Sequence, residues 1–216
     1  MKKYSTILFD LDGTLTDSSK GIINSIIYAL KKYDINDYDM LLLKKFLGPP
    51  LHESFEKYFG FDKEKSLQAV KFYREYFSTK GLLENEVYCG VNDLLQNLKE
   101  NGKTLIVATS KPQPFTDRIM EHFDLAKYFD FIAGSNMDTT RSKKAEVIDY
   151  ALSECNIKDK SKVVMIGDRA EDMIGAQTIG IDSIGVEYGY GTFDELKNAG
   201  ATYIVKTVDE LNKLLS

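Results

Sequence analysis

The sequence predicts an α/β protein with a doubly wound, mainly parallel sheet that is interrupted after its first strand by an all-helical insertion. Two observations predict this class. Short β-rich runs alternate with helical patterns from residue 103 onward, as in parallel sheets whose strands are joined by crossover helices. Residues 18–88 lack this alternation, and their apolar residues recur at helical spacing instead.

Six short segments have the composition of buried strands, one near the N-terminus and five after residue 103. The predicted strands are 6–9, 104–108, 131–133, 162–166, 183–186 and 203–205. The helical patterns that separate and follow the last five are 116–123, 143–155, 170–179, 193–199 and 208–214. Together these elements predict one sheet of parallel strands with helices on its faces.

The insertion at 18–88 divides the chain into a predicted core, 1–17 and 89–216, and a predicted helical cap. Residues such as Ile22, Ile26 and Leu30 give the cap its helical spacing. Because the insertion follows the first strand directly, we expect it to lie above that strand's carboxyl end, where ligands bind in open α/β sheets, and to act as a lid. The alternative is a helical bundle that never moves.

Composition narrows the possible functions. The chain has 216 residues, 43% of them hydrophobic and 28% charged, which is typical of globular proteins. Its formal net charge of -5 argues against a nucleic acid polymer as partner. No apolar run approaches the roughly 18 residues of a membrane span, so a cytoplasmic protein is expected. The two cysteines are far apart, with no CxxC and no histidines at metal-ligand spacing, and only two histidines are present. A histidine-rich zinc site or a Ser-His-Asp triad is therefore not expected.

Two aspartates follow the first predicted strand at once. Asp10 and Asp12 stand after the apolar run 7–9 and before Gly13 and Thr14. Side chains at i and i+2 of an extended chain point to the same face, so the two carboxylates are expected to share one site. Like charges that close resist ionising together. One carboxyl can then serve as nucleophile or metal ligand while the other holds a proton to deliver. A simple Asp-Gly turn is the alternative.

Hydroxyl side chains stand at the end of a second predicted strand. Thr109 and Ser110 follow the apolar run 105–108 and precede Lys111 and Pro112. Because Pro112 disfavours helix at Lys111, we expect the chain to turn there and to leave backbone amides near Thr109 and Ser110. Such a turn can bind an anion, although Thr and Ser before Pro are also common in ordinary loops.

A third polar group precedes the predicted helix at 143–155. Arg141, Lys143 and Lys144 lie together at this helix start. The helix dipole favours negative charge at that end, so a bound phosphate explains the three cations better than helix stability does. A solvated basic face is the alternative.

A fourth group ends the buried run 163–166, where the sequence reads GDRAED. Asp168 and Asp172 are four residues apart and can share a face once a helix has begun. Mg²⁺ prefers hard oxygen ligands such as carboxylates. We therefore expect Asp168 to bind Mg²⁺ directly with Asp172 just behind it, the alternative being that both acids cap the helix.

The nine residues 10–18, DLDGTLTDS, resemble the first signature of the haloacid dehalogenase-like superfamily, and the other three groups follow in that superfamily's order. The insertion also lies where members with a helical cap carry theirs. Within the superfamily the chain is most similar to the phosphoglycolate phosphatase and bacterial 5'-nucleotidase-like branch, by LGPPL at 47–51, TSKP at 109–112 and GVEYGYG at 185–191. It departs from that branch at Ser110, often Asn, and at Cys89, often Pro.

The resemblance implies a Rossmann-like core and Mg²⁺-dependent hydrolysis of a small phosphorylated metabolite through an aspartyl-phosphate. Asp10 would attack phosphorus, and Asp12 would act as general acid and then general base. In the superfamily pattern the third motif is a single lysine just before a helix, where Lys144 fits best and Lys143 second. The implied metal-binding residues are Asp10, Asp12, Asp168 and Asp172, and the implied phosphate-binding residues are Gly13, Thr14, Thr109, Ser110 and Lys144.

Substrate choice is predicted to depend on the cap loop that contains Gly48, Pro49, Pro50 and His52, although Gly-Pro-Pro is also an ordinary helix breaker. A phosphoryl-transferring mutase that acts on sugar phosphates would use the same four groups. A non-catalytic domain that binds a phosphorylated ligand or a protein is the other alternative. The sequence does not indicate an oligomeric state.

Overall fold

The computed structural model describes residues 4–138 and 140–216, and these divide into two compact units. The first unit comprises Met1–Asp17 and Val87–Ser216, and the second comprises Ser18–Glu86. The predicted boundary at the C-terminal end of the insertion was residue 88, two residues further along. Each unit is described by itself.

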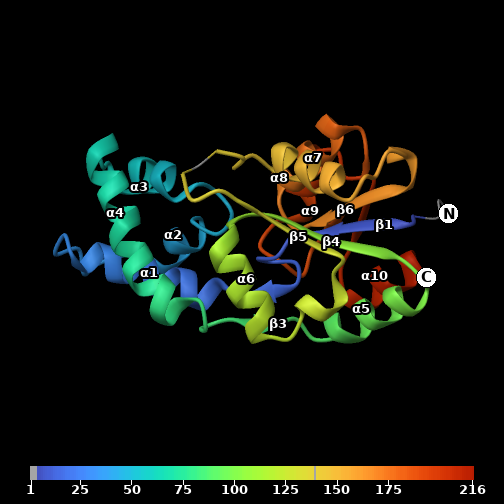
Figure 1. The fold of residues 1–216 in the computed structure, drawn as a ribbon. Helices are drawn as coiled ribbons and strands as arrows, with labels where there is room; N and C mark the ends of the chain where they lie inside the picture. The colour runs from blue at the N-terminus through green and yellow to red at the C-terminus, as the bar shows by residue number, and fades with distance from the viewer. Residues whose placement is uncertain (1–3, 139) are drawn as a thin grey trace. The chain divides into compact units, whose positions relative to one another are not determined.

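A six-stranded sheet forms the centre of the first unit (Figure 1). Its strand order is β5-β4-β1-β6-β7-β8, and every neighbouring pair is parallel. The strands are β1 (Thr6–Phe9), β4 (Thr104–Pro112), β5 (Phe131–Ser135), β6 (Val163–Gly167), β7 (Asp182–Val186) and β8 (Tyr203–Val205). The predicted doubly wound α/β fold is therefore confirmed, with β1 at the centre of the sheet.

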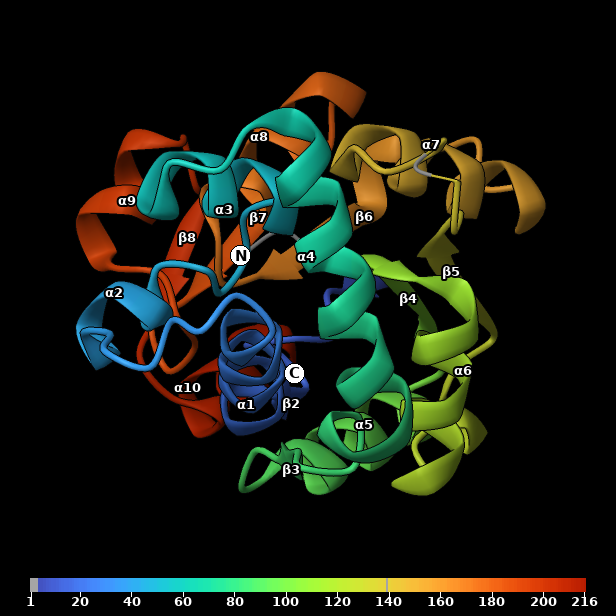
Figure 2. The same cartoon turned by 90° about the vertical axis from the view of Figure 1, so that its left-hand side faces the viewer.

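Helices cover both faces of this sheet (Figure 2). They are α5 (Val91–Glu100), α6 (Gln113–His122), α7 (Lys144–Glu154), α8 (Ala170–Ile179), α9 (Phe193–Asn198) and α10 (Val208–Leu215), with short 3-10 helices at Ala126–Tyr128 and Lys160–Lys162. Five of the six helices match predicted helical segments within three residues at each end. Helix α5 was not predicted, although Val91, Leu94, Leu95 and Leu98 have helical spacing and are buried.

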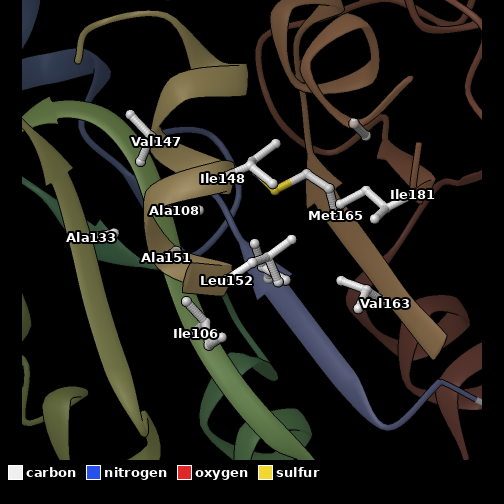
Figure 3. Close-up of a cluster of buried hydrophobic side chains, with 12 residues drawn as sticks. Ile106, Ala108, Ala133, Val147, Ile148, Ala151, Leu152, Val163, Met165 and Ile181 are labelled. Carbon is white, nitrogen blue, oxygen red and sulfur yellow. The ribbon is translucent and has the colours of Figure 1, made fainter. Parts of the chain in front are cut away.

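Apolar side chains on one face of the sheet pack against α7 and α8 (Figure 3). Alternate strand residues point to this face, as the two-residue period of a strand requires. The cluster comprises Leu8, Ile106, Ala108, Ala133, Val147, Ile148, Ala151, Leu152, Val163, Met165, Ala176 and Ile181. Because this packing fixes α7 and α8 against β1, β4 and β6, it also fixes the polar residues at the ends of these elements.

Strand β4 is longer than predicted. The sequence predicted a strand that ends at Ala108 and a turn at Lys111, but β4 continues to Pro112, which pairs with Ser135 of β5. The register shifts between Ala108 and Pro112, so the backbone is irregular where Thr109 and Ser110 lie. Pro112 then precedes α6, where the missing N–H of a proline costs no ladder hydrogen bond.

The second unit is helical. It contains α1 (Ser19–Lys31), α2 (Met40–Lys44), α3 (Leu51–Phe59), α4 (Lys63–Tyr76) and a π-helical turn at Phe77–Gly81. Stacked and edge-on aromatic rings, among them Phe46, Phe55 and Phe61, fill part of its interior. Two short strands, β2 (Thr16–Asp17) and β3 (Glu86–Val87), pair with each other. Among the described residues, no helix combines the length and apolar content needed to cross a membrane.

Candidate active site

Three buried carboxylates converge at the carboxyl end of the sheet. Asp10 follows β1, Asp168 follows β6, and Asp172 lies in the first turn of α8. One carboxylate oxygen from each lies within 4.8 Å of the others, and Asp168 and Asp172 are almost completely buried. Since β1 and β6 are neighbouring parallel strands, their ends bring residues 158 positions apart in the sequence into one group.

Lys144, the first residue of α7, is the cation that contacts this group. Its Nζ lies 2.8 Å from Asp10 Oδ1 and 2.7 Å from Asp172 Oδ1, and it also donates to the Ala108 carbonyl at 3.1 Å. Burial alone would lower the pKa of Lys144, but the charges of Asp10 and Asp172 more than offset this and raise it. The raised pKa favours the charged ammonium form of Lys144 in the interior.

One ammonium does not balance three carboxylates. Burial, together with the charges of Asp172 and Asp10, raises the pKa of Asp168 well above its usual value. Burial also raises the pKa of Asp172, although Lys144 opposes the shift. Both pKa shifts reflect mainly the cost of burying a carboxylate, to which the neighbouring carboxylates add, and a divalent cation would offset this cost. Three hard oxygen donors within 4.8 Å fit Mg²⁺, which binds carboxylates and keeps waters or substrate phosphate as its other ligands.

Asp12 is not part of this group, although it is only two residues from Asp10. Its Oδ2 lies 2.6 Å from Nζ of Lys111. The chain leaves the strand after Phe9 and turns at 11–16, where three N–H groups donate to the Leu11 carbonyl. The structure thus places the two aspartates beside two different lysines. That they act together on one ligand, as the sequence pattern predicted, stays a prediction.

Backbone groups and small residues enclose Asp168. The Tyr190 N–H donates to its Oδ2 at 2.8 Å, and the Thr14 hydroxyl donates to its Oδ1 at 3.4 Å. Gly13 has a φ of +80°, and a Cβ added there would lie 2.1 Å from Asp168 Oδ2. A Cβ at Gly189 would lie 2.2 Å from the Gly13 carbonyl. Glycine is therefore required at both positions to let the backbone approach this carboxylate.

Gly13→Ala is expected to disrupt the carboxylate group. The left-handed backbone costs about 1 kcal/mol for a non-glycine residue, and the clash with Asp168 adds to this. Gly180→Ala is a matched control, because Gly180 has a φ of +78° but open space where a Cβ would lie. Thermal unfolding with and without Mg²⁺ should show a larger loss of stability and a weaker response to Mg²⁺ in Gly13→Ala. Equal effects of the two substitutions would contradict this.

The two residues predicted to bind phosphate through hydroxyl groups, Thr109 and Ser110, differ in burial and in hydrogen bonding. Thr109 is buried, and its Oγ1 accepts a hydrogen bond from the Lys111 N–H at 3.3 Å. It directly follows Ala108, whose carbonyl contacts Lys144. Ser110 is exposed, and its carbonyl accepts from the Ser135 hydroxyl. Thr109 is thus linked to the site through the preceding residue, Ala108, and through its hydrogen bond with Lys111. Ser110 is linked through its carbonyl to β5.

Among the three cations before α7, only Lys144 contacts the carboxylates. Lys143 is exposed, and its N–H donates to the Glu146 side chain. The Arg141 guanidinium donates to the Gly134 carbonyl and stacks on the Tyr150 ring, 3.8 Å from the ring centre. The geometry favours Lys144 over Lys143, as the family pattern implied.

The predicted specificity loop belongs to the helical unit. Gly48 has a φ of +105°, Pro50 precedes the first turn of α3, and His52 lies in that turn. The His52 Nε2 lies 3.9 Å from Glu53 Oε1. The role of Gly48, Pro49 and His52 in substrate choice stays a prediction.

Sequence reasoning missed two features of the site. Lys111 was identified only as the residue before Pro112 and as part of the TSKP segment, although it contacts Asp12. Glu195 of α9 was not identified, although its Oε1 accepts from Arg169 Nε at 2.8 Å and from the Ala170 N–H at 3.0 Å, which satisfies the first N–H of α8. Glu195 lies 25 positions from Ala170, so no local sequence pattern indicates this contact.

Comparisons with known proteins found a family match and similar solved structures. Residues 7–186 match the family described as haloacid dehalogenase-like hydrolase. The crystal structure of a predicted phosphatase from Clostridium acetobutylicum superimposes with a TM-score of 0.93 at 52% sequence identity, over 99% of this chain and 98% of that one.

Two curated relatives have different names. The 5'-nucleotidase of Pseudomonas aeruginosa is 42% identical over 213 residues, which are 99% of this chain and 96% of the relative. The tyrosine-protein kinase PtkA of Mycobacterium tuberculosis is 36% identical over 211 residues, which are 97% of this chain and 72% of the relative. The similarity therefore extends over both units.

Proposed function

Because the chain belongs to the haloacid dehalogenase-like hydrolase family, we propose that it is a Mg²⁺-dependent phosphatase that cleaves small phosphate monoesters through an aspartyl-phosphate. The observation that carries the proposal is the group of three buried carboxylates around Lys144. Such a group costs stability as long as its charge is unbalanced. It is therefore explained better by ligand binding than by folding.

Asp10 is the proposed nucleophile. One of its carboxylate oxygens forms a bond to phosphorus, and the bond from phosphorus to the ester oxygen breaks. Asp12 gives a proton to the departing alkoxide, which leaves as an alcohol. Asp12 then takes a proton from water as the water oxygen attacks the phosphoryl group and regenerates Asp10 and inorganic phosphate. The same carboxyl thus acts as acid in the first step and as base in the second.

Positive charge assists both steps. Lys144 is held 2.8 Å from Asp10, where its ammonium can also neutralise a phosphoryl oxygen in the transition state. Asp10, Asp168 and Asp172 would hold Mg²⁺, which supplies Lewis-acid neutralisation of the phosphoryl oxygens when bound. Thr109 is proposed to donate its hydroxyl to the phosphoryl group. The N–H groups of Gly13 and Thr14 donate instead to the carbonyls of Thr16 and Leu11.

The substrate class is a small phosphorylated metabolite, such as a nucleoside 5'-monophosphate or phosphoglycolate, from a cytoplasmic pool. The name of the Pseudomonas aeruginosa relative, 5'-nucleotidase, supports the first of these. The net charge of -5 favours a small anion bound at local cations over a polyanion bound across a surface.

The decisive test is phosphate release from a panel of monoesters that includes nucleoside 5'-monophosphates, phosphoglycolate and sugar phosphates, in Mg²⁺ and in chelator. Release that requires Mg²⁺ is expected. Isomerised sugar phosphate without free phosphate would instead identify a mutase. Binding of the esters without turnover would identify a non-catalytic phospholigand-binding domain.

Asp168→Asn is expected to raise the Mg²⁺ concentration for half-maximal activity by roughly 10- to 100-fold, since a buried charged ligand is replaced by a neutral one of the same shape. Titration of activity with Mg²⁺ measures this. Asp149→Asn, which removes an exposed acid from α7, is the charge-matched control. An unchanged Mg²⁺ requirement in Asp168→Asn would remove Asp168 from the metal site.

A further inference from the structure

Asp12 has a buried cation of its own, which neither the family match nor the relatives' names assign. Nζ of Lys111 lies 2.6 Å from Asp12 Oδ2, and the Lys111 side chain is only 7% exposed. The backbone N–H of Lys111 also donates to the Thr109 hydroxyl. The lysine is therefore fixed at both ends, to the irregular part of β4 and to the loop after β1.

The pairing leaves one oxygen of Asp12 available. Its Oδ1 is buried and has no hydrogen-bond partner among residues 4–138 and 140–216. A buried polar atom without a partner costs free energy, so its presence in the site points to a ligand that it contacts. Lys111 thus holds the carboxylate by Oδ2 and leaves Oδ1 for an incoming group.

The two aspartates also contact different lysines. Lys144 draws the Asp10 carboxylate toward Asp172, and Lys111 draws the Asp12 carboxylate to the end of β4. Without Lys111, a free carboxylate two residues from Asp10 would be attracted by a divalent cation bound at Asp10. Its distance from the metal ligands therefore depends on the second ion pair.

We propose that Lys111 is a positioning residue that holds the Asp12 carboxylate away from the metal ligands, with Oδ1 directed to the leaving group. The inference rests on the proposed function, in which Asp12 transfers the proton. Lys111 acts through Asp12 and forms no bond in the reaction. Its removal should therefore slow turnover, with little effect on substrate binding.

Lys111→Met keeps the length of the side chain and removes the ammonium. Its kcat is expected to fall roughly 10- to 100-fold, as for a displaced catalytic group, while KM and the Mg²⁺ requirement change less than about threefold. Lys111→Arg should recover much of the loss, because a guanidinium also pairs with a carboxylate. The control is Lys99→Met, which breaks the exposed Lys99–Asp130 pair with the same change of charge and should keep wild-type kcat.

A double-mutant cycle tests whether Lys111 acts through Asp12. In an Asp12→Asn background, Lys111→Met is expected to cause no further loss of kcat. An equal loss in both backgrounds would overturn the inference. A large rise in KM with kcat retained would also overturn it, because Lys111 would then bind substrate directly.

The wild-type chain, the two single variants and the double variant are also compared by thermal unfolding. This measurement detects the ion pair without requiring catalytic activity. Lys111→Met should lower the melting temperature of the wild-type chain more than that of Asp12→Asn, and equal shifts would overturn the pairing. If the wild-type chain releases no phosphate from any monoester, the proposed phosphatase function fails. The unfolding cycle then still decides whether Lys111 holds Asp12.

Discussion

Asp10→Asn is expected to reduce phosphate release roughly 10⁴-fold or more, as removal of a covalent nucleophile does in other enzymes. The amide keeps the shape of the side chain but has no carboxylate to attack phosphorus. A loss of this size corresponds to about 5 kcal/mol of transition-state stabilisation. Steady-state phosphate release under saturating Mg²⁺ measures it.

The fold should survive this substitution. Asp10 shares its surroundings with Asp168 and Asp172, so a neutral residue there relieves repulsion among buried carboxylates while Lys144 keeps its contact with Asp172. The melting temperature without metal is expected to stay close to that of the wild-type chain. Substantial activity in a well-folded Asp10→Asn protein would rule out Asp10 as the nucleophile.

Lys144→Met is expected to have the second largest effect. Removal of one charged donor to a reacting phosphoryl group costs about 10²- to 10³-fold in kcat. Here the loss also leaves Asp10 and Asp172 without their buried cation, which destabilises a folded protein by about 3–5 kcal/mol. Methionine keeps most of the aliphatic stem, which passes so close to α8 that a Cβ at Gly175 would lie 2.8 Å from Lys144 Cγ.

Lys143→Met is the matched control, since it removes the same charge from the adjacent, exposed position. It should leave both activity and melting temperature near wild-type values. Mg²⁺ should restore part of the stability lost in Lys144→Met, because it supplies positive charge to the same carboxylates. If Lys143→Met abolishes activity and Lys144→Met does not, the assignment of the lysine is wrong.

Local sequence patterns predicted most of the fold because the strands of this sheet are short apolar runs that contain no competing helical spacing. The six strands and five of the six core helices lie where these patterns indicated, and the family resemblance is confirmed by the match over residues 7–186. Helix α5 was missed although its spacing was visible. The length of β4 was underestimated because Pro112 reads as a strand terminator, yet it pairs at the edge of a register shift.

Local sequence patterns predicted only part of the candidate site. Motif order identified Asp10, Asp168 and Asp172, since residues that follow parallel strands meet at one edge of the sheet. It could not separate Lys143 from Lys144 by chemistry alone. Successive helical residues point about 100° apart, so the packing of α7 on the sheet decides which lysine is buried.

The sequence by itself determined the parallel sheet, the helical insertion and the carboxylates at the strand ends, because each of these follows from hydrophobic period and residue type within one segment. Only the tertiary structure decided how charges pair: Lys144 with Asp10 and Asp172, and Lys111 with Asp12. Ion pairing depends on distances of a few ångströms between residues far apart in the chain, and these distances are set by the packing of the whole sheet.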